Sequence, residues 1–487
     1  MTFALHSDFL PQATPYDPAE DPPGGVDPLG TLSGAESLAE VLLPGLTARM
    51  WRARLLTWAA LAVRVAERVV ETASTAEDGE SYRDEARLAA ERFCVSALAR
   101  HDDWGKAARQ RLPGIRLARR ALAANDRPLG PEGFLKGQAV NGPIGVIARL
   151  ARAVNIIDED YRLGRGGHEL LAAWERERHL PGIIDERPSK NDGSRLITRF
   201  ANGVRKHLQE SWWPRANWPF WNDLARHLRL DELGPQEADV ILRLLADDVR
   251  GVRRRVLELL QTEGTVATYR RMQQVAGRGT VARTILVEEI LPRTQGSSDE
   301  IDRGITYAVR LIDAYEAVAG LLEVVFRTLQ WALTRRSGQA NNDSLLHDPA
   351  IAQRLEHTTA ELRPDTETLR TLLAACGDHP CVSDVAGLSA ARELSDDALQ
   401  AGLGPEQLLE VVMSRHHQVQ KARGKGPWIA RDGQQWTLMP GFGDNREEPP
   451  VVDSGYLHPM RIRNAYSFLR DLRRVSMEIE SDGEEES

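Results

Sequence analysis

Ala308–Leu333, which reads AVRLIDAYEAVAGLLEVVFRTLQWAL, is the stretch that decides the fold of this chain. Its apolar side chains recur every three or four residues, which is the period of one face of an α-helix. Arg310, Asp313 and Glu316 interrupt the apolar run, whereas a membrane-spanning helix needs about 20 consecutive, mostly apolar residues. The stretch therefore predicts a long helix that packs against other helices of a soluble protein.

The same helical period recurs on both sides of this stretch. Pro44-Gly45 separates the first two helices, and Pro235 stands at a first helical position, where its missing N–H is harmless. We expect a mainly α-helical protein with multi-helix domains of the bundle or solenoid class. The predicted helices cover residues 37–42, 46–70, 82–100, 143–154, 168–177, 235–261, 264–291, 298–335, 349–361, 365–376, 405–423 and 458–475.

The period of the sequence changes near the C-terminus. Pro427–Ala430 and Gln435–Met439 flank Asp432-Gly433, a dipeptide that favours the tight turn of a β-hairpin. We therefore expect a small C-terminal β-hairpin between the last two helices.

Composition divides the chain into six segments. The first is rich in proline, which removes backbone donors and fixes φ, and the last is strongly acidic. The segments are an extended Pro-rich N-terminal arm (1–33), a helical region with a winged-helix-like unit (34–180), a Trp/Pro-rich connector (181–233), an α-helical domain (234–410), a basic helix with the β-hairpin and a final helix (411–476), and an acidic disordered tail (477–487).

Charge and cysteine content limit the functional classes. The chain has a net charge of −9, so it produces no overall positive field that would attract nucleic acid or an anionic membrane. Any nucleic-acid site must therefore be a local patch. Three cysteines and the lack of a signal-peptide pattern predict a cytoplasmic protein without a disulfide framework.

The sequence contains no clear catalytic signature. It has no Walker loop, no Gly-x-Ser-x-Gly elbow and no His-Glu-x-x-His motif. Cys376, His379 and Cys381 lie close together, but zinc takes four ligands and no second Cys/His pair follows at a suitable spacing. The sequence thus favours a non-enzymatic protein with no catalytic residues, cofactor or metal. His101-Asp102 is similar to the His-Asp pair of metal phosphohydrolases, which keeps an enzymatic alternative open.

The segment from Val411 to Ala430 contains no acidic residue, although the chain as a whole is acidic. A basic helix end, a glycine-bounded turn and an indole ring are suited to hold a phosphate backbone and to stack on a base. The alternative is an ordinary solvated helix C-terminus, where cations complement the helix dipole. The candidate residues are Arg415, His416, His417, Lys421, Arg423, Lys425 and Trp428.

A second candidate lies between residues 142 and 177. A helix, a short apolar strand, an acidic turn, a second strand and a final helix follow one another in the order of a winged-helix unit, in which one helix enters the major groove. Arg149, Arg152 and Arg162 belong to the groove-facing helix and the wing in this interpretation. Winged helices also dock proteins, so a protein-binding role stays open.

Arg49, Arg52 and Arg54 form a third candidate, interleaved with Trp51 early in a predicted helix. Arg49 and Arg52 are three residues apart, so they would lie on the same face of a helix. A solvated face is the ordinary explanation of such a pair. The tryptophan-rich stretch 212–221 is assigned to the core or to a domain interface in preference to a stacking platform.

Asp27–Gly30, Leu43–Thr47 and Arg52–Arg54, together with the run from His416 through Trp428 to Met439-Pro440-Gly441, resemble an uncharacterised bacterial family. Members of that family are encoded in anti-phage defence islands, beside helicases and phospholipase-D-like nucleases. The resemblance covers a small fraction of the 487 residues and leaves out the central helical region. It implies a context in antiviral defence and no particular reaction.

The main functional hypothesis is a non-catalytic nucleic-acid-binding and scaffolding subunit of a prokaryotic anti-phage defence system. Its partners would be DNA or RNA and other defence proteins such as a helicase or nuclease, with no membrane partner. One alternative is a protein-binding scaffold or sensor whose basic segment binds an acidic partner or the chain's own tail. A further alternative is a metal-dependent nuclease or phosphohydrolase.

Overall fold

A computed structural model describes most of the chain. The predicted N-terminal arm up to residue 26 and the acidic segment from residue 477 lie outside the described residues. The described residues are 27–72, 82–101, 112–124, 129, 134–135, 137–185, 187–376, 379–383, 386–433, 435–451 and 455–476.

The chain folds into two compact units, each of which collects separate stretches of sequence. Unit 1 consists of Met1–Ser37, Arg310–Asp378 and Val385–Leu457. Unit 2 consists of Leu38–Val309, His379–Asp384 and His458–Ser487.

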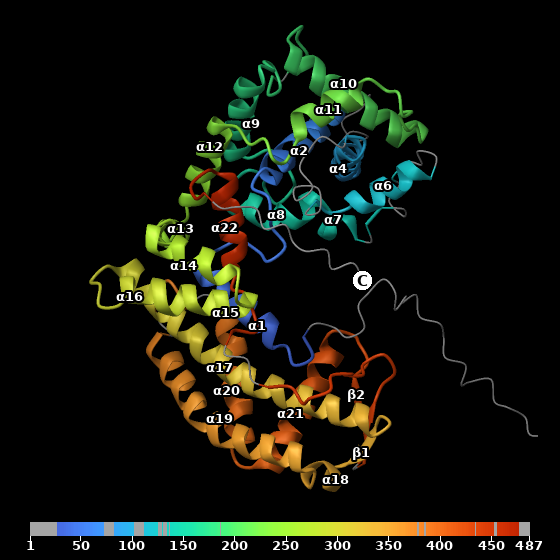
Figure 1. Cartoon of the computed structure of the whole chain (residues 1–487). Coiled ribbons are helices and arrows are strands. Elements are labelled where there is room, and N and C mark those ends of the chain that lie inside the picture. The colour runs from blue at the N-terminus through green and yellow to red at the C-terminus, as the bar shows by residue number, and fades with distance from the viewer. Residues whose placement is uncertain are drawn as a thin grey trace, which may run out of the picture. The chain divides into compact units, whose positions relative to one another are not determined.

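Helices dominate both units (Figure 1), which confirms the predicted mainly α fold class. The division between the units falls within α1 (Thr31–Leu42) and α17 (Glu300–Arg335), the helix predicted by the opening stretch. Unit 2 further contains α2 (Leu55–Glu71), α4 (Arg83–Ala99), α6 (Ile115–Ala123), α7 (Gln138–Asn141), α8 (Pro143–Ala153), α9 (Arg165–Arg178), α10 (Asp192–Glu210), α11 (Phe220–Leu228), α12 (Pro235–Ala246), α13 (Val252–Leu260), α14 (Glu263–Gln273), α15 (Arg278–Arg283), the π-helix η2 (Thr284–Ile290), α16 (Leu291–Thr294) and α22 (Ile462–Asp471). Unit 1 further contains α18 (Asn342–Leu346), α19 (Pro349–Cys376), α20 (Ala386–Ala401) and α21 (Pro405–Ala422).

Helix α2 forms the core of unit 2. It is buried nearly all round, and α4, α8, α9 and α10 pack against it. Its first half, Leu55–Val63, is apolar on nearly every face, and such a helix is stable only when other elements cover it. The composition of α2 therefore places it at the centre of its unit.

Helices α19, α20 and α21 pack on one another in unit 1. α19 runs unbroken through Pro364, so the predicted break between 361 and 365 is wrong. An internal proline costs a helix about 3 kcal/mol. Leu362 and Leu369 on either side of it are fully buried, and their packing outweighs that cost.

The predicted β-hairpin is present in unit 1. β2 (Ile429–Asp432) pairs antiparallel with β3 (Gln435–Leu438), in the register Ile429↔Leu438. A third strand that the sequence did not predict, β1 (Gln339–Asn341), adds to the other edge of β3. Three residues are too few to show a period of two, which explains why β1 was missed.

The helix predicted over 235–261 is two helices. α12 ends at Ala246, and Gly251 adopts a φ of +68° before α13 begins. The carboxylate of Asp248 accepts the backbone N–H of Arg253 at 3.2 Å and so caps the start of α13. The chain therefore starts a new helix here and does not continue α12. Val249, in the interval between the two helices, is fully exposed.

The winged-helix-like unit is not confirmed. Between α8 and α9 the chain forms only one antiparallel bridge, Ile157↔Leu163, where two strands were predicted. The intervening loop turns through Tyr161 at a φ of +53°, and its ring lies under the guanidinium groups of Arg87 and Arg152, 3.8 and 4.6 Å from its centroid. These cation–π contacts hold the loop without a β-ladder.

Of the helices in the described ranges, none combines enough length with enough apolar side chains to cross a membrane.

Candidate nucleic-acid interface

The basic segment occupies the C-terminal half of α21 and the turn that follows it. Residues 421–426 are exposed, and we call them the basic turn. Gly424 has a φ of +66°, a left-handed conformation that glycine adopts without strain. This glycine ends the helix and directs the chain toward β2.

Arg415 is buried, contrary to the expectation of a solvent-facing cation. Its side chain is 9% exposed, its Nε donates to the Leu29 carbonyl at 2.7 Å, and its Nη1 pairs with Asp397 at 2.6 Å. These donors are used inside unit 1, so the guanidinium is not presented to a phosphate backbone.

His416 and Trp428 are also buried, at 0% and 2% exposure, which corrects the expectation of an exposed cation and an exposed indole. Nδ1 of His416 lies 3.0 Å from the Pro28 carbonyl oxygen, and its Nε2 accepts the backbone N–H of Trp428 at 2.9 Å. Burial lowers the pKa of His416 to about 4, so its ring is neutral at pH 7. The indole stacks on Phe442 with the ring centroids 5.1 Å apart.

His417 and Arg423 are engaged within the same unit. Nε2 of the half-buried His417 lies 2.8 Å from the Ile429 carbonyl oxygen, and Nη2 of Arg423 pairs with the Asp27 carboxylate at 2.6 Å. Burial acts to raise the pKa of Asp27, but hydrogen bonds from Arg423 and Ser33 outweigh it and hold that pKa below its ordinary value. The expectation of an unpaired charge is therefore wrong for Arg423.

Asp27 also caps α1. Its carboxylate oxygens accept the backbone N–H groups of Leu32 and Ser33 at 3.0 and 3.1 Å. α1 consequently begins at Thr31, inside the segment that was predicted to be an extended arm. Asp27 thus joins the start of one helix to the end of another.

Lys421 and Lys425 remain exposed, and neither contacts an acidic side chain among the described residues. Space is open around Gly424 and Gly426, so nothing covers the turn there. The Lys425 N–H donates to the Gln420 carbonyl at 2.9 Å, which closes the turn. His416 and His417, in the helix before the turn, contact the backbone of Trp428 and Ile429, which follow the turn. The buried members of the predicted site thus hold the turn, and its two lysines face solvent.

Two of the three arginines of the second candidate site pair with acidic side chains. Arg149 is 58% exposed and pairs with Glu40 at 3.0 Å, while Arg152 pairs with Glu159 at 3.2 Å. Arg162 is exposed, and its backbone N–H donates to Asp158 at 2.7 Å. The residues predicted to form this patch therefore alternate with carboxylates and do not form a positive surface.

The third candidate precedes α2 and is not helical. Arg49 is exposed and donates to the Asn141 side chain at 2.9 Å. Arg52 and Arg54 are only 7% and 1% exposed, so the expectation that they present charge to nucleic acid is wrong. Both reach inward, Arg54 to the last turn of α11 and Arg52 to the linker between α11 and α12.

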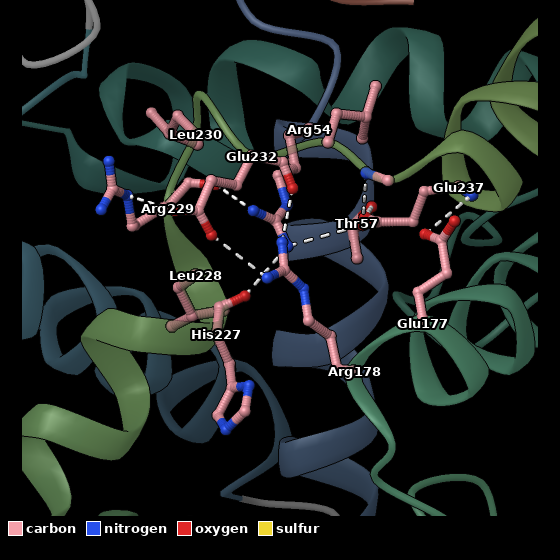
Figure 2. A network of polar contacts seen from close by, with 12 residues as sticks. Arg54, Thr57, Glu177, Arg178, His227, Leu228, Arg229, Leu230, Glu232 and Glu237 are labelled. Atoms are coloured by element: carbon pink, nitrogen blue, oxygen red, sulfur yellow. Dashed lines mark hydrogen bonds and ion pairs between the residues drawn. The ribbon is translucent and has the colours of Figure 1, made fainter. Parts of the chain in front are cut away.

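The last residues of α11 and the linker that follows them, residues 227–233, are held by an arginine clamp that consists of Arg52, Arg54 and Arg178. Figure 2 shows Arg54 and Arg178 against this backbone. Arg54 donates to the carbonyl oxygens of His227, at 3.0 Å, and of Arg229. Arg52 donates to the Leu230 carbonyl at 2.7 Å, and Arg178 donates to the Glu232 carbonyl. The segment lacks the hydrogen-bond partners that regular secondary structure would supply, so guanidinium groups supply them.

Glu237 balances the charge of the clamp from the first turn of α12. It is fully buried, pairs with Arg54 at 3.5 Å and accepts the Thr57 hydroxyl at 2.8 Å. Burial lowers the pKa of Arg54 to about 10, while Glu237 opposes that shift, so Arg54 stays charged at pH 7. Figure 2 also shows Glu177, whose carboxylate accepts backbone N–H groups at the start of α12. None of these acidic partners was singled out from the sequence, because only the fold brings them together.

The tryptophan-rich stretch packs around Phe93 of α4. Trp213, Trp218 and Trp221 lie with their ring centroids 4.9, 6.1 and 5.6 Å from that of Phe93. Trp221 is 1% exposed. This arrangement agrees with the interpretation of the stretch as part of a core.

No three His, Cys, Asp or Glu side chains gather closely enough to hold a metal ion within the described part of the chain. Comparison with protein-family models, with curated proteins and with solved structures finds no match for the chain.

Proposed function

We propose that this protein is a non-catalytic scaffolding subunit that contacts nucleic acid through the basic turn. The observation that carries the proposal is the exposure of Lys421 and Lys425 on a turn whose far end is held by buried His416 and half-buried His417. The resemblance of short N- and C-terminal stretches supports a place in a prokaryotic anti-phage defence system.

Two lysines define the kind of contact that the turn can make. Each ammonium neutralises about one phosphate, so log K against log salt on duplex DNA should fall with a slope of about −1.8 for two contacts. Such contacts fix the position of a nucleic acid and carry no sequence information. The turn therefore suits a subunit that holds nucleic acid for partner proteins.

The scaffolding part of the proposal is supported by the way unit 2 uses its arginines. Arg52 and Arg54 saturate backbone carbonyls that would otherwise lack partners, and α2 is enclosed by four helices. Buried hydrogen bonds and close packing favour one arrangement of side chains. The outer faces of such a unit are thereby pre-organised for partner proteins.

An acidic protein segment is the second candidate ligand of the basic turn. Trp428 is buried, so the turn offers no exposed ring for base stacking. This observation favours a ligand recognised by its negative charge alone, which describes both a phosphate backbone and an acidic peptide.

A salt titration separates the two ligands. Fluorescence anisotropy of the full chain with labelled duplex DNA and with single-stranded RNA should show binding at low salt. Lys421→Glu with Lys425→Glu should flatten the salt slope by about 1.8 on duplex DNA and by about 1.4 on single-stranded RNA. Lys190→Glu with Arg303→Glu is the matched control, because it changes the charge equally at two other exposed positions.

Undetectable binding at low salt contradicts the nucleic-acid proposal. So does an unchanged salt slope in the Lys421/Lys425 variant. Binding of a poly-glutamate peptide with no binding of nucleic acid supports the acidic-segment alternative.

A further inference from the structure

One acid-free segment of unit 2 is longer than the one around the basic turn. Residues 264–287 include four arginines and no Asp or Glu, in a chain with 71 acidic residues. Arg270, Arg271 and Arg278 are exposed, and the half-buried Arg463 of α22 lies near them across a pocket. We call Arg270, Arg271, Arg278 and Arg463 the arginine surface.

A pocket opens at the arginine surface between α14, α15 and α22, which lie together in Figure 1. Its volume is about 70 Å³. Apolar side chains and two guanidinium groups share its wall, so it suits the end of one aliphatic side chain beside carboxylates. The lining residues are Tyr269, Gln273, Ala276, Arg278, Val281, Ile462 and Arg463.

The described chain ends beside Arg270 of the arginine surface. The Arg270 guanidinium donates to the carbonyl oxygen of Ser476, the last described residue, and Tyr269 beside it lines the pocket. The sequence continues as MEIESDGEEES, with six acidic residues in eleven and with Met477 and Ile479 alternating with Glu478 and Glu480. An extended chain advances about 3.4 Å per residue, so these first residues are within reach of the pocket.

We propose that residues 477–487 bind back onto the arginine surface of their own chain. In this arrangement Met477 or Ile479 enters the pocket, and the acidic side chains pair with Arg271 and Arg278. Ion pairs at exposed positions are individually weak. A tether of a few residues gives an effective concentration in the millimolar range, which is enough to populate weak contacts. The acidic segment thus competes with any other polyanion for the arginine surface.

The proposal predicts slow cleavage of the acidic segment by a glutamyl endopeptidase. The initial rate of cleavage after Glu478 and Glu480, measured by mass spectrometry, should be lower in the full chain than in a free peptide of residues 474–487. Arg271→Ser with Arg278→Ser should raise the rate in the full chain roughly 3- to 10-fold, since two exposed ion pairs are lost. Lys190→Ser with Arg303→Ser, at exposed positions elsewhere, should leave the rate unchanged.

A second variant tests the same contact from the side of the acidic segment, so the test does not depend on correct folding of the arginine variant. Asp482→Asn with Glu484, Glu485 and Glu486 changed to Gln keeps both cleavage sites and should accelerate cleavage in the same way. Added salt at about 0.5 M should also remove the protection, because exposed charges are then strongly screened. Equal rates in the wild-type chain and the free peptide overturn the proposal. Protection that grows with protein concentration shows that the segment of a second copy binds, which overturns the intramolecular form.

Discussion

The arginine clamp and the basic turn use cations in opposite ways. Arg54 in the clamp is 1% exposed, and its guanidinium donates to backbone carbonyls. Lys421 and Lys425 in the turn face solvent. Guanidinium is weakly hydrated and presents several fixed donors, whereas ammonium is compact and strongly hydrated. The partners available inside the fold therefore decide which cations are free to bind a ligand. The density of basic residues along the sequence does not.

Arg415, His416 and Arg423 form a third group, in which His416 is as buried as Arg54 and Arg423 is partly exposed. They were predicted as ligand-binding residues together with the lysines, yet each has a partner inside unit 1. Burial together with the charge of the buried partner therefore predicts an order of effects on stability, from Arg54, which pairs with buried Glu237, through His416 and Arg423 to the lysines.

Arg54→Ala should have the largest effect. It leaves Glu237 buried without its cation and His227 and Arg229 without a donor, and breaking a buried ion pair from one side costs about 3–5 kcal/mol. The free energy of unfolding of unit 2 should fall by that amount. Urea titration, with hydrogen exchange followed in α2 and α12, measures it. Arg49→Ala is the control, because Arg49 is exposed. Equal stability of the two variants would break the comparison.

The contribution of His416 should depend on pH. Its pKa is about 4 in the folded chain and about 6.5 when unfolded, so its stabilisation is present above pH 6.5 and is lost as the pH falls through 4. The advantage of the wild-type chain over His416→Gln should therefore shrink by about 3 kcal/mol between pH 7 and pH 4. Urea unfolding at a series of pH values, with exchange read in β2 and β3, measures it. An advantage that stays constant with pH would contradict a buried, neutral ring.

Arg423→Ala should have an intermediate effect. Hydrogen bonds to a charged group contribute about 1.5–3 kcal/mol, and partial exposure of Arg423 places its loss near the lower end, at about 1–2 kcal/mol. Removal of Arg423 also takes away the strongest partner of Asp27, so protection of the first turn of α1 against hydrogen exchange should fall as well. If α1 keeps its protection, Asp27 caps the helix without help from Arg423.

Lys421→Ala with Lys425→Ala should have the smallest effect on stability. Substitutions at exposed positions without partners usually change the free energy of unfolding by less than about 0.5 kcal/mol. Thermal unfolding of the variant should therefore match that of the wild-type chain. A large loss of stability would show that the lysines have structural partners and would remove the distinction between clamp and turn.

Much of the fold could be predicted from the sequence. The apolar faces of α2, α17 and α21 and the Asp432-Gly433 turn are local patterns, and local patterns determine these elements. The break at Gly251 and the continuity of α19 through Pro364 could not be predicted, because a capping carboxylate decides one and packing on neighbouring helices decides the other. The two units each combine distant stretches, which a reading along the chain cannot show.

The candidate site was predictable only in part. The acid-free stretch led to the prediction of a nucleic-acid-binding site around residues 415–425. Of its cations, Lys421 and Lys425 are exposed. The burial of Arg415 depends on Leu29 and Asp397, which are distant in sequence, and the burial of Arg54 depends on Glu237. Periodicity gives the face of a helix but does not say which residues from other segments cover that face.

The most direct test of the proposed function is to map where nucleic acid contacts the full chain. Ultraviolet cross-linking to RNA that contains 4-thiouridine, followed by mass spectrometry of the peptides, identifies the contact residues. The account predicts cross-links in the peptide that covers residues 421–426 and none in the peptide that carries Arg52 and Arg54. Cross-links confined to other segments, with the basic turn unmodified, would contradict it.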